Sequence, residues 1–286
     1  MQPQIRAFFD EATFTVTYLV SDPATRIGAV IDPVLDYDPK SGRTSTRSAD
    51  AVLAAAEQGG ISIAWILETH AHADHLSAGA YLRGKTGAKI AISEHITTVQ
   101  KTFAPIFNQS ETSVDGREFD RLAKDGDKLA LGNLSIEVLF TPGHTPACIT
   151  YKIADAVFVG DTLFMPDNGT ARTDFPGGDA RTLYRSIKKI LSFPPETRLF
   201  MCHDYKAPGR DSYAWQTTVA EQRAKNVHIN DAVSEDVFVA MRTTRDKTLA
   251  MPVLILPSIQ VNIRAGDLPP AESNGTRYLK IPLDRI

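Results

Sequence analysis

Histidine and aspartate are concentrated in a few short segments of this chain. Five of its seven histidines share these segments with two aspartates. The residues are His70, His72, Asp74, His75, His144, Asp161 and His203. Imidazole and carboxylate together suit zinc, iron or manganese, whereas calcium sites use oxygen ligands alone. His95 and His228 stand alone, and a solitary histidine is more often an ordinary polar residue than a ligand. The pattern therefore predicts a metal centre.

Short apolar segments precede the polar residues, as expected of strands that carry a site at their ends. Four such segments are Ile61–Glu68, Leu134–Phe140, Ala156–Val159 and Arg198–Cys202, and they lead to His70, His144, Asp161 and His203 respectively. Strand ends on one edge of a sheet can meet in space although they are distant in sequence, and functional residues sit on loops that a rigid scaffold holds. We therefore expect the four polar residues to converge.

The rest of the chain predicts further strands and helices. Strands are expected at Thr13–Val20, Ile27–Val34, Lys89–Ser93 and Ile149–Lys152. Helices are expected at Ala49–Glu57, Ala78–Arg83, Ala180–Leu191, Trp215–Asn226 and Ser234–Arg242. Residues 38–48 are expected to be a loop, residues 94–125 an insertion that carries helical turns, and residues 252–286 a Pro-rich tail.

Composition argues against several classes of protein. The formal net charge of -3 and the pI near 6.2 give no general attraction to nucleic acid or to an anionic membrane. No apolar run is long enough to cross a bilayer, and the first residues lack the apolar region of a signal peptide. Cys148 and Cys202 are too few for a disulfide framework and form no zinc-cage spacing, so a cytoplasmic protein without a closed structural zinc site is expected.

The order of the motifs resembles that of metallo-β-lactamase-fold hydrolases. The matching features are the HxHxDH run at 70–75, Gly143-His144, Gly160-Asp161 and the late His203, and the resemblance covers roughly residues 12–230. It implies an α/β fold, an αββα sandwich in which two mixed β-sheets are flanked by helices. We expect a single catalytic domain over residues 1–286, with a C-terminal extension, residues 231–286, packed on the core.

The dinuclear members of this family imply one arrangement of ligands. One metal ion would be held by His70, His72 and His144 and the other by Asp74, His75 and His203, with Asp161 bridging the two. Such enzymes activate water between two Lewis-acidic ions for attack on a carbonyl or phosphoryl centre.

A narrower resemblance leads to the persulfide dioxygenase branch, which is similar to glyoxalase II in fold. It rests on the strings TPGHTPACITY (141–151), GDTLF (160–164) and ARTDFPGG (171–178). Carried over by position, it implies one Fe²⁺ ion per chain, bound by His70, His144 and Asp161. Two imidazoles and one carboxylate leave positions open on iron for a thiolate and for O₂. The implied reaction converts glutathione persulfide, O₂ and water to sulfite and glutathione. The other four residues of the cluster, His72, Asp74, His75 and His203, would then orient the ligands through hydrogen bonds.

Five residues are candidates for substrate binding. Arg172 and Asp174 could form an ion pair below the metal site or contact the substrate. Arg223 and Arg245 could bind the glutathione carboxylates, and Tyr205 could line the pocket. The insertion at 94–125 and a longer loop at 165–170 depart from the short persulfide dioxygenases and could reshape the pocket. The C-terminal tail could wrap the domain or mediate a homodimer.

Other functions stay open. A glyoxalase II-like hydrolase of glutathione thioesters would hold one or two Zn²⁺ ions per chain, and all seven ligands for two ions are present. A non-catalytic metal-binding module would need a closed metal site, and a His/Asp cluster without a cysteine cage argues against one. A nucleic-acid-processing member of the fold would usually carry extra domains and basic surfaces.

Overall fold

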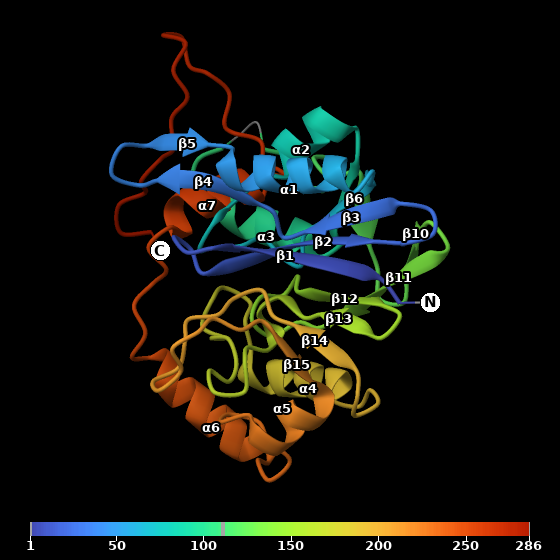
Figure 1. Ribbon diagram of the computed structural model, residues 1–286. Coiled ribbons are helices and arrows are strands. Elements are labelled where there is room, and N and C mark those ends of the chain that lie inside the picture. The colour runs from blue at the N-terminus through green and yellow to red at the C-terminus, as the bar shows by residue number, and fades with distance from the viewer. Residues whose placement is uncertain (1, 110–111, 286) are drawn as a thin grey trace.

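Two six-stranded sheets lie face to face, with helices on both outer sides, in the computed structural model of the chain (Figure 1). The structure describes residues 2–109 and 112–285. In spatial order, the first sheet contains β1 (Gln4–Asp10), β2 (Thr15–Ser21), β3 (Ile27–Ile31), β6 (Ser62–Leu67), β8 (Lys89–Ser93) and β9 (Arg121–Ala123). The second contains β10 (Lys128–Leu131), β11 (Leu134–Phe140), β12 (Ile149–Ile153), β13 (Ala156–Phe158), β14 (Arg198–Phe200) and β15 (Gln216–Thr218). Both sheets mix parallel and antiparallel pairs, so the predicted sandwich of two mixed sheets is confirmed.

The central strands carry buried side chains on both of their faces. In β13, Ala156 and Phe158 enter the core between the sheets, whereas Val157 packs under the helices of the second sheet. In β3, Ala29 and Ile31 likewise face the other sheet. Successive side chains of a strand point to opposite faces, so each central strand contributes to two apolar layers.

Helices cover the outer faces of both sheets (Figure 1). The first sheet is covered by α1 (Arg47–Gln58), α2 (Gly79–Thr86) and α3 (Ile96–Phe103), and α7 (Ile255–Asn262) packs into the same apolar layer. The second sheet is covered by α4 (Ala180–Ile190), α5 (Val219–Lys225) and α6 (Glu235–Asp246). The chain therefore returns from the second half to the first between α6 and α7.

Several predictions of local structure were wrong. The expected loop at 38–48 contains β5 (Arg43–Ser45) and the first residues of α1. β5 pairs with the preceding β4 (Val34–Asp38), and the two form a small third sheet with β7 (Leu76–Ser77). The side chains of β5 are all exposed, so the strand carries no alternation to detect. The helix expected from Trp215 begins only at Val219, because β15 comes first and the side chain of Thr218 caps the helix.

Two further segments hold more regular structure than the sequence indicated. The Pro-rich tail contains α7, in which Pro257 lies in the first turn, where proline is tolerated. The insertion at 94–125 contains α3 and ends in β9, an edge strand of the first sheet; its residues 110 and 111 lie outside the described residues.

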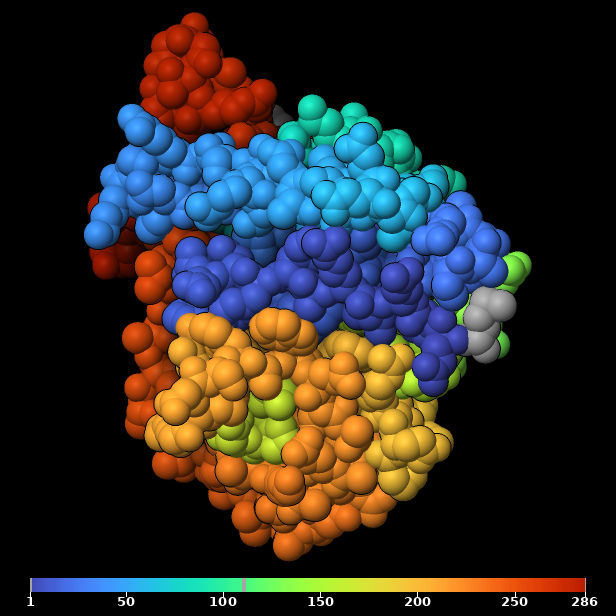
Figure 2. Space-filling view, viewed as in Figure 1, coloured from blue at the N-terminus to red at the C-terminus, as the bar shows by residue number. Residues whose placement is uncertain are grey.

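Part of the C-terminal segment projects from the surface, as Figure 2 shows in red. Most residues from 267 to 285 are exposed, although Gln260 in α7 holds the main chain of Lys280 through two hydrogen bonds. Within the described ranges, no helix combines the length and apolar character needed to span a membrane.

Candidate metal centre

Strands from both sheets deliver the predicted metal-binding residues to one place. The segment between β6 and β7 carries four of them, and the other three follow strands of the second sheet. In chain order these are His70, His72, Asp74 and His75, then His144 after β11, Asp161 in a 3-10 turn after β13, and His203 after β14. The structure brings all seven together in two neighbouring groups.

The first group consists of His70, His144 and Asp161. Their ligand atoms all lie within 4.8 Å of one another, and all three residues are buried. Oδ2 of Asp161 is 3.9 Å from Nε2 of His70 and 3.7 Å from Nε2 of His144. Two imidazole nitrogens and one carboxylate oxygen therefore face a common point.

The second group consists of His72, Asp74, His75 and His203, with ligand atoms within the same limit of one another. Nε2 of His203 is 3.1 Å from Oδ2 of Asp74. The resemblance to dinuclear members implied His72 beside His70 and His144, whereas its ligand atom lies here with those of Asp74, His75 and His203. Asp161 lies between the groups, because its second oxygen, Oδ1, is 3.3 Å from Nε2 of His203.

Hydrogen bonds fix which ring nitrogens of the first group carry protons. Nδ1 of His144 is 2.8 Å from the main-chain oxygen of Arg172, which can only accept, so Nδ1 is protonated. Nδ1 of His70 faces Oγ1 of Thr69 at 3.0 Å, and this hydroxyl already donates its hydrogen to Asp32. Both histidines therefore turn the lone pair of Nε2 toward the carboxylate of the group, as metal-binding histidines do.

The sequence analysis did not identify two buried acidic residues that lie beside the cluster, Asp32 and Glu68. Asp32 accepts hydrogen bonds from the main-chain nitrogen of Thr69 at 2.8 Å and from Nε2 of His72 at 3.0 Å. Glu68 is hydrogen-bonded to the hydroxyl of Ser77, and burial raises the pKa of Glu68 to about 8. A signal was present, since Asp32 and Glu68 each directly follow a strand, β3 and β6 respectively.

Burial keeps His70 and His72 neutral. Burial and then the neighbouring histidines lower the pKa of His70 and of His72 well below the ordinary value. Burial would raise the pKa of Asp74, but His203 and His75 hold that pKa well below its usual range. Neutral imidazoles beside ionised carboxylates are the protonation states that bind metal ions.

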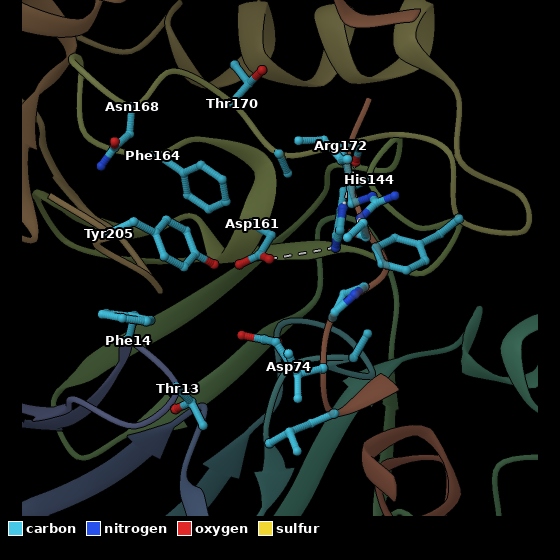
Figure 3. Close-up of a pocket in the computed structure, with 18 of the residues that line it drawn as sticks. Thr13, Phe14, Asp74, His144, Asp161, Phe164, Asn168, Thr170, Arg172 and Tyr205 are labelled. Atoms are coloured by element: carbon cyan, nitrogen blue, oxygen red, sulfur yellow. Dashed lines mark hydrogen bonds and ion pairs between the residues drawn. The ribbon is translucent and has the colours of Figure 1, made fainter. Parts of the chain in front are cut away.

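A cavity of about 710 Å³ opens above the first group. His144, Asp161 and Asp74 line it (Figure 3). Its walls are mainly apolar and include Phe14, Phe164, Phe175, Leu249, Pro252, Val253 and Leu254. The segment between α6 and α7 supplies the last four of these side chains.

The predicted substrate-binding residues differ in where they lie. Arg172 and Asp174 form a bidentate ion pair, with bonds of 2.6 and 2.7 Å, and only Arg172 lines the cavity. Tyr205 lines it too, with its hydroxyl turned toward Asp161 (Figure 3). Arg245 lines the cavity from α6, and within the described residues it has no ion-pair partner. Arg223 does not reach the cavity, because it is exposed on α5 and paired with Asp231 at 2.9 Å.

The buried polar atoms of the two groups fit a metal ion. Within residues 2–109 and 112–285, six of them have no hydrogen-bond partner: Nε2 of His70, His75 and His203, Nδ1 of His72, Oδ2 of Asp74 and Oδ1 of Asp161. Leaving a buried polar atom unpaired costs about 1–3 kcal/mol, so a cluster of six calls for a shared partner. The nitrogen and carboxylate donors suit a divalent transition metal.

Comparison with known proteins adds a family and several relatives. Residues 11–203 match the Metallo-beta-lactamase superfamily. The chain is 58% identical over 293 residues to a probable metallo-hydrolase of Burkholderia pseudomallei, with 99% of each chain covered. It is 50% identical over 286 residues to Glyoxylase B2 of Dictyostelium discoideum, covering 99% of this chain and 98% of that one. It spans 65% of the length of the beta-lactamase hydrolase-like protein of Agrobacterium fabrum, to which it is 53% identical.

More distant similarity extends to proteins named ETHE1. Persulfide dioxygenase ETHE1 of Homo sapiens is 29% identical over 266 residues, covering 92% of this chain and 88% of that one. The solved structure of ETHE1 from Myxococcus xanthus is similar with a TM-score of 0.74 and 30% identity, covering 92% of this chain and all 100% of that one.

Proposed function

The chain belongs to the metallo-β-lactamase superfamily, and we propose that within it the chain is a persulfide dioxygenase that uses one Fe²⁺ ion held by His70, His144 and Asp161. One observation carries the proposal: the first group offers two histidines and one aspartate, and His72 lies with the second group instead. Two histidines and one carboxylate are the donor set of non-haem iron oxygenases. Similarity to ETHE1 over the whole length of the bacterial structure supports it.

The proposed reaction converts a persulfide of a small thiol, such as glutathione persulfide, to sulfite. With O₂ and one water molecule, the products are the thiol, sulfite and two protons. The terminal sulfur loses four electrons to O₂, takes up three oxygen atoms, and leaves when the S–S bond breaks. When bound, iron would supply open positions for the persulfide sulfur and for O₂.

The chain's own residues would orient the substrate and exclude water. The apolar rings of Phe14, Phe164 and Phe175 line the cavity beside the first group and leave water few partners there. The guanidinium of Arg245 would bind a carboxylate of the thiol, because it lines the same cavity and its neighbour Arg242 is already committed to Asp246 at 2.6 Å.

A second candidate is a glyoxalase II-like hydrolase of glutathione thioesters with two Zn²⁺ ions. It is favoured by the second group of ligands, with Asp161 between the groups, and by the 50% identity to Glyoxylase B2. A non-catalytic module is less well supported, because a cavity opens directly above the first group, whereas structural metal sites are closed.

The test is the metal content of protein expressed in iron-supplemented medium, combined with O₂ uptake on glutathione persulfide. About one iron per chain with rapid, substrate-dependent O₂ uptake supports the dioxygenase. Two zinc ions per chain, no O₂ uptake and hydrolysis of S-lactoylglutathione would replace it with the hydrolase.

A further inference from the structure

Helix α6 holds the Arg172-Thr173-Asp174-Phe175 motif from outside the metal centre. The main-chain nitrogen and Oγ1 of Thr173 both donate to Oδ2 of Asp246, at 2.9 and 3.0 Å. One turn earlier in α6, Nη1 of Arg242 donates to the main-chain oxygen of Thr170 at 3.0 Å. The chain is thus fixed on both sides of Arg172.

The two α6 residues also bind each other. Nε and Nη2 of Arg242 lie 2.8 and 2.6 Å from Oδ1 of Asp246, and the two side chains are only 1% and 4% exposed. A buried ion pair is weak evidence for a contribution to stability, because apolar residues of similar volume often serve as well. What apolar residues could not replace are the three hydrogen bonds to residues 170 and 173.

The segment held in this way carries the acceptor for a metal-site histidine. The main-chain oxygen of Arg172 receives the Nδ1–H of His144, which directs Nε2 toward Asp161. Partners of the non-coordinating ring nitrogen fix the tautomer and the orientation of a metal-binding histidine.

We propose that Arg242 and Asp246 are positioning residues for His144. They fix residues 170–173, so that the main-chain oxygen of Arg172 keeps accepting the hydrogen bond from Nδ1 of His144. The lone pair of Nε2 of His144 then keeps facing the metal site. The proposal rests on His144 as a metal ligand, a role that both candidate functions share.

The test compares the wild type with Asp246→Asn and Thr173→Val. Asp246→Asn keeps the shape but replaces one acceptor oxygen by a donor, and Thr173→Val removes only the Oγ1 bond. Nitrogen NMR of metal-free protein, at a mildly alkaline pH where imidazole is neutral, reports the tautomer of His144. We expect Asp246→Asn to lower the Nδ1–H population and to weaken Zn²⁺ binding about tenfold. Thr173→Val should change the Nδ1–H population and the Zn²⁺ affinity in the same direction as Asp246→Asn, but by a smaller amount.

Arg185→Gln is the matched control. It removes the ion pair between Arg185 and Glu235 at 3.1 Å, which ties α4 to α6 without touching residues 170–173. It should leave the tautomer and the Zn²⁺ affinity unchanged. An unchanged tautomer and affinity in folded Asp246→Asn, with only a lower melting temperature, would overturn the proposal. If that variant does not fold, the same result in Thr173→Val decides against it. Neither readout depends on turnover, so failure of the dioxygenase assay is a separate result.

Discussion

Nε2 of His203 faces Oδ1 of Asp161 at 3.3 Å and Oδ2 of Asp74 at 3.1 Å. Nδ1 of His203 lies 3.3 Å from the main-chain oxygen of Phe14, so a neutral ring would turn the lone pair of Nε2 toward the two carboxylates. Burial lowers the pKa of His203, but Asp74 and Asp161 outweigh it and raise that pKa. A positive charge is therefore favoured between His203 and the two carboxylates. In the mononuclear dioxygenase it would be a proton on His203, and in the dinuclear hydrolase a second metal ion.

Alanine variants of the two groups separate these functions. We expect His144→Ala and Asp161→Ala to lose bound metal and turnover together, because each removes one of three ligands. In the mononuclear enzyme, His75→Ala and His203→Ala should keep about one iron per chain and lose at most about 10–100-fold in activity. Metal analysis and O₂ uptake on the same preparations measure both effects. Loss of metal and activity in all four variants alike would contradict the mononuclear site.

The hydrogen bonds that Asp32 makes to residues of the metal-binding segment lead to a second prediction. In the wild type, Oδ1 of Asp32 accepts from the main-chain nitrogen of Thr69 and from Nε2 of His72, and Oδ2 accepts from Oγ1 of Thr69. Asp32→Asn turns one of these two acceptor oxygens into a donor, so at least one bond is lost and the orientation of the histidine run should loosen. We expect metal affinity to fall about 10–100-fold. Asp22→Asn is the control: Asp22 is also buried and accepts a main-chain hydrogen bond, from Asn133 at 2.7 Å, but it lies in the turn between β2 and β3. Competition with a chelator measures both variants, and equal affinities for the two would refute a specific role for Asp32.

The sequence predicted the cluster because its members stand at strand ends or in one dense run. It could not predict how the ligands divide into groups, since His72 is two residues from His70 yet its ligand atom lies with His203, which is far along the chain. Side-chain direction decides this, and here a hydrogen bond to Asp32 sets the direction. The same limit applies to Arg223 and Arg245. Both are helix-borne arginines, and only packing determines which of them reaches the cavity.

Some elements of the fold were hidden for a related reason. β1 and β5 lie at sheet edges, where one or both faces stay accessible and the alternation of apolar side chains is weak. α7 was hidden among prolines, and its buried face becomes evident only once the first apolar layer is assembled around Ile255 and Ile259.

The two arginines give a matched pair for substrate recognition. Arg245→Gln should raise the KM for glutathione persulfide about tenfold or more with little change in kcat, because a hydrogen bond to a charged group contributes about 1.5–3 kcal/mol. Arg223→Gln removes an exposed arginine that is paired with Asp231 and should leave both constants unchanged. Steady-state O₂ uptake measures them. Equal effects of the two substitutions would mean that Arg245 does not contact the substrate.

His228 should make stability depend on pH outside the metal site. Burial, followed by Arg242 and Arg245, lowers its pKa to about 4. Nδ1 of His228 also accepts a hydrogen bond from the main-chain nitrogen of Thr170 at 3.0 Å, which requires an unprotonated nitrogen. Between the folded pKa and the ordinary value of 6.5, the unfolded chain binds more protons, so stability falls as pH falls through this window.

We expect His228→Asn to remove this dependence, because asparagine keeps an acceptor near Nδ1 and does not titrate. The ring is partly exposed, so after a discount for solvent screening the difference should be about 1 kcal/mol. Urea unfolding of the metal-free wild type and variant, at neutral pH and near pH 5, measures it. The wild type should lose more stability than the variant on acidification. A stability difference that stays constant across this range would show that His228 titrates in the folded protein as it does in the unfolded chain.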